Sequence, residues 1–286
     1  MTLLESAVGS MLDSEVAQSA PIAGGDMASA FRFRLADGRI VFAKTHPSPP
    51  AGFFSREAAD LRWLAEVKAL PVPQVLAVCD DDPAFLALAW IEPGAERPST
   101  DAAFGSGLAG LHRAAADCFG RTDGRTTGSL ALPNETTETW AEFYSERRLL
   151  PLARIASDRN SLSAATIARI ESVAARLDGL GGPVEPPARL HGDLWAGNRL
   201  IDADGDSWLI DPASHGGHRE FDLAMMRVFG GFGADAFDGY NDRFPLADGW
   251  QARVPLHQLA PLVVHSIKFG GAYVGAVERA LDSLGA

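Results

Sequence analysis

The sequence predicts an α+β fold of two unequal lobes, in which a small antiparallel β-sheet with one helix precedes a larger, mostly helical part. Two observations lead to this prediction. Residues 22–91 are mostly strand-like and contain a single helical segment, whereas apolar residues after Pro93-Gly94 recur at helical spacing. We therefore place an N-terminal lobe at residues 1–91 and a C-terminal lobe at residues 92–286. A chain of 286 residues is long enough to give both lobes a core.

The small lobe is expected to contain two strands, a helix and two further strands. The turn dipeptide Asp37-Gly38 joins the first two strands as a hairpin. The helix runs from Ser55 to about Ala69, with Ser55 as its N-cap and Pro71 just beyond its end. The four strand-like segments are residues 30–35, 39–45, 74–78 and 85–91.

The large lobe is expected to be helical around a short region of loops and hairpin. Residues 179–187 are rich in Gly and Pro and form a loop, and a short hairpin turns at Asp204-Gly205. Residues 105–110 match the pattern G-x-G-x-x-G, but they follow no strand, so the match does not indicate a dinucleotide site. Amphipathic spacing predicts helices at residues 101–112, 139–152, 166–177, 222–229 and 256–280.

The composition is that of a globular protein, with 47% hydrophobic and 22% charged residues. The net charge of −12 argues against nucleic acid as a partner, because phosphate binding needs clustered Lys and Arg. No apolar run is long enough for a membrane span, and the N-terminus lacks the features of a secretory signal. Cys79 and Cys118 are too few for a disulfide framework. We therefore expect a cytoplasmic protein that binds neither nucleic acid nor a membrane.

Residues 191–211 supply the groups that phosphoryl transfer from ATP requires. Asp193, in the run His191-Gly192-Asp193, provides a carboxylate, Asn198 provides a carboxamide, and Asp211 ends a short apolar strand. We predict that Asp193 is the catalytic base for the substrate hydroxyl, and that Asn198 and Asp211 hold Mg²⁺ against the nucleotide. A His-x-Asp motif also occurs in metallohydrolases, but no further His or Cys cluster in the nearby sequence completes a zinc set.

Residues in the small lobe fit the task of binding the triphosphate. Lys44 ends an apolar strand, and Glu57 lies early in the next predicted helix. A lysine and a glutamate in these positions hold the α- and β-phosphates in protein-kinase-like folds. Gly24 and Gly25 are expected between the first two strands, where a loop must fold over the phosphates. An ordinary turn is the alternative interpretation of these two glycines.

Several motifs together resemble one known family. The shared His-Gly-Asp motif is followed by Leu194-Trp195, and five further motifs lie at residues 140–144, 211–213, 217–225, 229–232 and 269–273. With these motifs the chain resembles the fructosamine kinases, or ketosamine 3-kinases, within the protein-kinase-like superfamily that includes aminoglycoside and choline kinases. The resemblance extends from Gly24 to the predicted C-terminal helix.

The resemblance implies a bilobal protein-kinase-like fold, with ATP and Mg²⁺ as cofactors. It implies ATP-dependent phosphorylation of the sugar 3-hydroxyl in ketosamines, either small molecules or glycated protein lysines, which leads to deglycation. Trp195 and His265 are then expected to contact the substrate together with Asp193, and backbone groups near Trp90 to contact adenine. Asp222 is expected to anchor the catalytic loop. One departure concerns the acceptor, because the chain lacks the tyrosine expected after residues 211–213.

Two alternatives remain open at this point. The first is a phosphotransferase for another hydroxyl compound, such as an amino sugar or an aminoglycoside. The second is a nucleotide-binding scaffold without turnover, which the presence of Lys44, Asp193, Asn198 and Asp211 argues against. No sequence feature specifies the preferred sugar, the amine or the oligomeric state, for which we expect a monomer.

Overall fold

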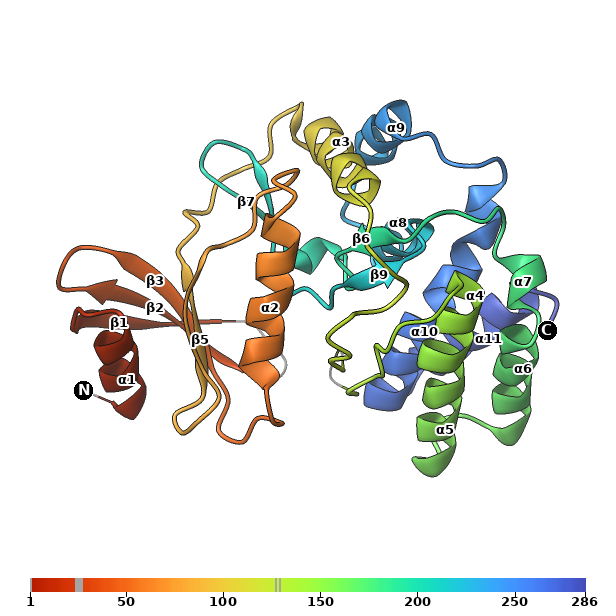
Figure 1. Cartoon of the computed structure of the whole chain (residues 1–286), viewed down its shortest axis with the longest axis horizontal. Helices are drawn as coiled ribbons and strands as arrows, with labels where there is room; N and C mark the ends of the chain where they lie inside the picture. Colours follow the sequence, from red (N-terminus) through yellow and green to blue (C-terminus); the bar gives the residue numbers. More distant parts are fainter. Residues whose placement is uncertain (1, 24–27, 127, 129) are drawn as a thin grey trace. The chain divides into compact units, whose positions relative to one another are not determined.

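The computed structural model describes residues 2–23, 28–126, 128 and 130–286. The chain divides into two compact units (Figure 1). The first unit contains residues up to Arg97 together with Arg199–Pro212, and the second contains Pro98–Asn198 together with Ala213–Ala286. In the described part of the chain, no helix has the length and apolar character needed to cross a membrane.

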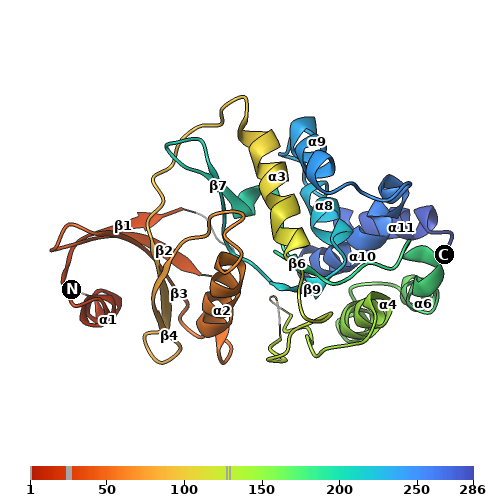
Figure 2. The same ribbon diagram turned by 45° about the horizontal axis from the view of Figure 1, so that its top comes forward.

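The first unit is built on a five-stranded antiparallel sheet in the order β1-β2-β3-β5-β4. Its strands are β1 (Val16–Ile22), β2 (Ser29–Leu35), β3 (Ile40–Thr45), β4 (Val75–Cys79) and β5 (Phe85–Ala89). Helix α1 (Leu3–Met11) packs on one face of the sheet, and helix α2 (Phe53–Ala65) packs on the other (Figures 1 and 2). Because both faces are covered, alternate residues of β5 enter two different cores, which explains its uninterrupted apolar run.

A hairpin far along the chain completes the first unit. Its strands are β7 (Arg199–Ile201) and β8 (Ser207–Leu209). The Gly94 N–H donates to Ile201 O at 2.9 Å, and the Leu209 N–H donates to Pro71 O at 3.0 Å. The hairpin therefore places Asp211, which follows β8, in the same unit as β3 and α2.

The second unit is mostly helical. A two-stranded sheet of β6 (Ala188–Leu190) and β9 (His215–Gly217) lies among its helices. Helix α3 (Thr100–Arg113) packs closely on α9 (Ala234–Arg243) (Figure 2), where a Cβ on Gly105 would lie only 1.9 Å from Ala236 O. The glycine-rich pattern at residues 105–110 therefore serves helix packing. The helices are α3 (Thr100–Arg113), α4 (Trp140–Tyr144), the π-helical turn η1 (Ser145–Leu149), α5 (Leu150–Asp158), α6 (Ala164–Ala174), α7 (Leu177–Leu180), the short 3₁₀ turn η2 (Ala196–Asn198), α8 (Glu220–Met226), α9 (Ala234–Arg243), α10 (Trp250–Phe269) and α11 (Ala272–Ser283).

Most of the predicted strands and helices are present, but α9, β6 and β9 were not predicted. The prediction of one helix at residues 256–280 is wrong, because Gly270 and Gly271, both with positive φ, separate α10 from α11. Helix α1 and strand β1 were not predicted, although Thr2 and Glu5 form a capping box at the start of α1.

The prediction of Ser55 as the N-cap of α2 is wrong, because α2 begins after Gly52. The carboxylate of Asp80 instead accepts the exposed N–H groups at the start of the helix, including that of Phe54 at 3.0 Å. This cap comes from a distant loop, which local sequence cannot show.

Candidate active site

The side chain of Lys44 lies between two carboxylates in the first unit. Phe42 packs on the α2 side of the sheet, and since side chains alternate along a strand, Lys44 points to the same side. Glu57, three residues after the buried Phe54, faces it from α2. The Lys44 Nζ lies 2.5 Å from Glu57 Oε2 and 2.7 Å from Asp211 Oδ1. A strand, a helix and the end of a hairpin thus meet at one ammonium group.

The electrostatics of this trio keep the ammonium charged. Burial alone would lower the pKa of Lys44, but the charges of Glu57 and Asp211 outweigh burial and raise the pKa above its ordinary value. The side chains of Lys44 and Glu57 are only 11% and 13% exposed, whereas that of Asp211 is 51% exposed. Asp211 therefore anchors Lys44 with one oxygen while its carboxylate remains accessible from solvent.

The backbone at Asp211 has a left-handed conformation, with φ of 52°. Such a conformation is uncommon for a residue with a Cβ, although Asp tolerates it better than most. Leu209 is buried in the first unit, and the left-handed turn after it redirects the chain. Local strain of this kind is often found where a side chain must be presented in one orientation.

The second unit presents Asp193 on the loop that follows β6. The Asn198 side-chain amide donates to Asp193 O at 2.8 Å and to Asp193 Oδ2 at 3.1 Å. Both hydrogens of this amide are directed at Asp193, so the polar atom that Asn198 can offer to a cation is its Oδ1. Oxygen donors of this kind, an amide oxygen and a carboxylate such as that of Asp211, suit Mg²⁺.

Asp222 holds the backbone of the same loop from helix α8. Its two carboxylate oxygens accept the N–H groups of His191 and Gly192 at 2.7 and 2.9 Å. His112 Nε2 lies 3.2 Å from Asp222 Oδ2, and His112 Nδ1 lies 2.8 Å from the Tyr240 hydroxyl. Asp222 is fully buried, but these donors outweigh the effect of burial and lower its pKa below the ordinary value. It is therefore an ionised anchor for the loop.

Gly192 is required by the shape of this loop. Its φ is +82°, and a Cβ at this position would lie 2.1 Å from Ala213 O. His191 is fully buried, its Nδ1 accepts the Asp193 N–H at 3.2 Å, and its carbonyl accepts from Ala213 N at 2.9 Å. These contacts give His191 a structural part in the loop.

Aromatic side chains gather beside the Asp193 loop. Phe229 lies 5.7 Å from Trp195 and 5.2 Å from His265, measured between ring centroids. Trp195 is 38% exposed, so the side chain expected to contact substrate is open to solvent. The structure thus brings Trp195 and His265, two predicted substrate contacts, into contact with the same phenylalanine.

The Trp140-x-x-Phe143-Tyr144 motif has a structural explanation. Helix α10 contains Pro261, which has no N–H to donate within the helix. The Tyr144 hydroxyl enters the preceding turn, donating to Leu256 O at 2.8 Å and accepting from Ala260 N at 3.2 Å. Trp140 stacks on Tyr144 at 5.1 Å. The motif therefore stabilises the helix that carries His265.

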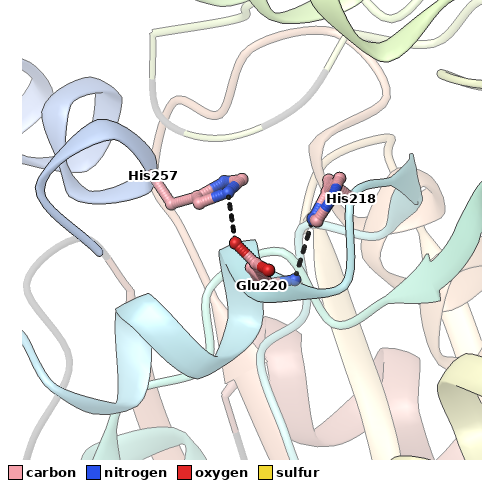
Figure 3. Close-up of side chains that lie close together, drawn as sticks. All are labelled: His218, Glu220 and His257. Atoms are coloured by element: carbon pink, nitrogen blue, oxygen red, sulfur yellow. Dashed lines mark hydrogen bonds and ion pairs between the residues drawn. The ribbon is translucent and has the colours of Figure 1, made fainter. Parts of the chain in front are cut away.

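His218, Glu220 and His257 form a second buried cluster (Figure 3). Their ligand atoms lie within 4.8 Å of one another, as in a metal site. However, Arg253 donates to both carboxylate oxygens of Glu220, at 2.5 and 2.8 Å, and neutralises the charge that a cation would need. His218 Nδ1 accepts the Glu220 N–H at 3.3 Å, so a neutral His218 carries its proton on Nε2 rather than a lone pair. We interpret this cluster as structural.

The remaining predicted site residues are placed as follows. Gly24 and Gly25 lie outside the described residues. Trp90 follows β5, where its indole N–H donates to Glu92 at 2.8 Å and Arg32 stacks on its ring at 5.1 Å. These contacts position the Trp90 side chain. The binding of adenine by backbone groups near Trp90 stays a prediction.

Sequence patterns did not identify every residue that supports the site. His112 was placed only on a helical pattern, and no local signal connects it to Asp222, which is 110 positions away. Phe229 was noted only as part of a motif, although it contacts both predicted substrate residues. Contacts over such separations become visible only in the folded chain.

A family model, a curated relative and a solved structure that resemble this chain all concern fructosamine or ketoamine kinases. The model of the fructosamine kinase family matches residues 2–286. A "Probable ketoamine kinase" of Enterococcus faecium is 34% identical over 267 residues, which cover 92% of this chain and 94% of that protein. The crystal structure of a provisionally assigned fructosamine-3-kinase from Thermobifida fusca is 41% identical, with a TM-score of 0.92 and 99% of each chain covered.

A solved structure with lower sequence identity to this chain shows the same type of fold. The choline kinase of Streptococcus pneumoniae is 15% identical, with a TM-score of 0.64 over 99% of this chain and 98% of that chain. At this identity the similarity concerns the fold alone. The predicted α+β fold of protein-kinase-like type is confirmed.

Proposed function

Because the chain belongs to the fructosamine kinase family, we propose that it transfers the γ-phosphoryl group of ATP to the 3-hydroxyl group of a ketosamine. The family membership makes the chain an ATP-dependent phosphotransferase. The proposal concerns the acceptor, namely ribulosamines or fructosamines as small molecules or on protein lysines. It also includes a deglycation role in the cytoplasm.

The observation that carries the proposal is the position of Lys44 between Glu57 and Asp211. An ammonium group fixed by a buried glutamate is a point charge that can bind the α- and β-phosphates without reorganising. Glu57 provides this fixation at 2.5 Å. The more exposed Asp211 and the Oδ1 of Asn198 are the proposed ligands of Mg²⁺. Mg²⁺, when bound, neutralises charge on the phosphate oxygens.

Asp193 is proposed as the base that accepts the proton of the 3-hydroxyl. The Asn198 amide holds one of its carboxylate oxygens at 3.1 Å, which fixes the side chain in one orientation. Asp222 fixes the backbone on which Asp193 stands, through the N–H groups of His191 and Gly192. Proton acceptance by a carboxylate positioned in this way contributes roughly 10²–10⁴ in rate.

Trp195 and His265 are proposed to contact the acceptor. Trp195 is two residues from Asp193 and exposes part of its ring, and aromatic faces bind the apolar faces of sugars. The proposals for adenine at the Trp90 backbone and for phosphates at Gly24 and Gly25 are supported by the family resemblance.

The test is a coupled assay of ADP release with Mg²⁺-ATP and one of four acceptor conditions: ribulose-lysine, fructose-lysine, an aminoglycoside or no acceptor. The proposal predicts turnover that depends on a ketosamine and is lost in Asp193→Asn. The variant Asp235→Asn, on the exposed start of α9, is the matched control and should keep full activity. Turnover with the aminoglycoside alone would overturn the proposed acceptor, and an active Asp193→Asn variant would overturn the proposed base.

A further inference from the structure

Five ring side chains of the second unit form an exposed aromatic patch, made of Trp195, Phe229, His265, Phe269 and Tyr273. Tyr273 lies 5.0 Å from His265 and 6.0 Å from Phe269. Phe229 is 43% exposed and Phe269 is 52% exposed. Large apolar side chains that gather on a surface without being covered indicate a binding site.

A pair of glycines follows each phenylalanine of the patch. Gly230 and Gly231 follow Phe229, Gly270 and Gly271 follow Phe269, and all four glycines have positive φ. A Cβ on Gly231 would lie only 2.5 Å from the Cβ of Ala196, the residue after Trp195. The turn after Phe229 therefore packs directly on the loop that carries Asp193, so the Phe229 end of the patch lies beside the proposed base.

The patch also contains a hydrogen-bond acceptor. His265 Nδ1 lies 2.8 Å from Pro261 O, and because a carbonyl can only accept, the proton of a neutral His265 is on Nδ1. Its Nε2 then carries a lone pair, and no described residue donates to it. Aromatic faces attract cations, and an acceptor among them favours a cation that carries N–H. Together these groups have the chemistry needed to recognise an alkylammonium group.

We propose that the aromatic patch binds the protonated amine of the ketosamine together with the alkyl group attached to it. His265 Nε2 accepts the ammonium N–H, and the ring of Phe229 covers the cation and its neighbouring CH₂ groups. Phe269 supplies apolar surface alone, because the Lys268 ammonium already lies 5.2 Å from the centre of its ring. This inference rests on the proposed function. In a ketosamine the amine nitrogen is bonded to C1, two carbons from C3, so a 3-hydroxyl at Asp193 places the amine a few ångströms further along the patch.

The test compares two acceptors that share one sugar and one alkyl group. One is the fructose adduct of an alkylamine, and the other is the ether in which oxygen replaces the amine nitrogen. The wild-type enzyme is expected to prefer the amine by roughly 10-fold in kcat/KM. Phe229→Leu and His265→Phe should each reduce this preference to about 2-fold. Phe237→Leu, an aromatic residue of α9 that packs on Trp250 instead, should keep the full preference.

The outcomes separate the inference from the proposed function. Equal use of amine and ether by the wild-type enzyme, or an unchanged preference in both patch variants, would overturn the amine subsite and leave the ketosamine kinase intact. Failure of the wild-type enzyme to use either acceptor would overturn the proposed function and the subsite with it. Thermal unfolding of each variant shows whether the fold is retained, and Phe229 is exposed enough for leucine to be accommodated.

Discussion

The substitution Asp222→Asn tests how the second unit positions the loop that carries Asp193, the proposed base. Asp222 accepts two backbone N–H groups, from His191 and Gly192, and it contacts His112 at 3.2 Å. An asparagine has one acceptor oxygen, so its NH₂ group must face at least one of these donors. A hydrogen bond to a buried charged group contributes about 1.5–3 kcal/mol. We therefore expect a loss of roughly 2–4 kcal/mol, divided between folding stability and loop position.

The expected kinetic result is a fall in kcat of about 100-fold with a small change in the KM for ATP, because a displacement of about 1 Å at the base has this effect. The melting temperature should fall by several degrees, at about 2–4 °C per kcal/mol for a chain of this size class. Asp202→Asn is the matched control. Asp202 accepts two backbone N–H groups at 2.9 Å and the Trp208 indole N–H at 2.7 Å, but it lies in the hairpin of the first unit.

Steady-state kinetics and thermal unfolding of both variants test whether Asp222 determines the position of Asp193. Asp202→Asn should keep kcat near the wild-type value, and Asp222→Asn should not. A wild-type kcat in a folded Asp222→Asn variant would refute the reasoning, because it would show that the anchor does not determine the position of Asp193.

Three further predictions concern other parts of the chain. Lys44→Met should lower kcat/KM for ATP by roughly 10²–10³-fold through loss of phosphate stabilisation, and unchanged ATP kinetics would contradict the assigned role. Tyr144→Phe should lower the free energy of unfolding in urea by about 1–3 kcal/mol, because it removes the hydroxyl from the turn of α10, and it should leave kcat unchanged. Burial raises the pKa of Glu220, but Arg253 and His257 outweigh it and lower the pKa from 4.5 to about 2. The stabilisation from Glu220 is therefore complete above pH ~4.5 and is lost as the pH falls towards ~2, so Glu220→Gln should flatten melting temperature against pH in this window.

Sequence patterns predicted the parts of the fold that depend on local periodicity. Most strands and helices follow from strand-like runs or from helical spacing, and the strand-end position of Lys44 follows from the apolar run that precedes it. Asp193, Asn198 and Asp211 could also be identified as candidate site residues from the sequence, because they belong to short motifs. The structure adds the contacts of both Glu57 and Asp211 with the Lys44 ammonium.

The features that were missed all depend on contacts between distant parts of the chain. Asp80 caps α2 from a loop 26 positions after Phe54. His112 reaches Asp222 across 110 positions, and Tyr144 completes a turn of α10 across 112. Local propensity contains no information about such partners, because burial and hydrogen bonding in these cases are decided by tertiary packing.

The most direct test of the central claim is the position of the phosphate on the product. The enzyme would be incubated with Mg²⁺-ATP and fructose-lysine, and the product examined by ¹H–³¹P correlation spectroscopy. The account predicts a phosphorus correlation to the proton at C3, present with the wild-type enzyme and absent with Asp193→Asn. A correlation to any other carbon position, or to the lysine moiety, would contradict it.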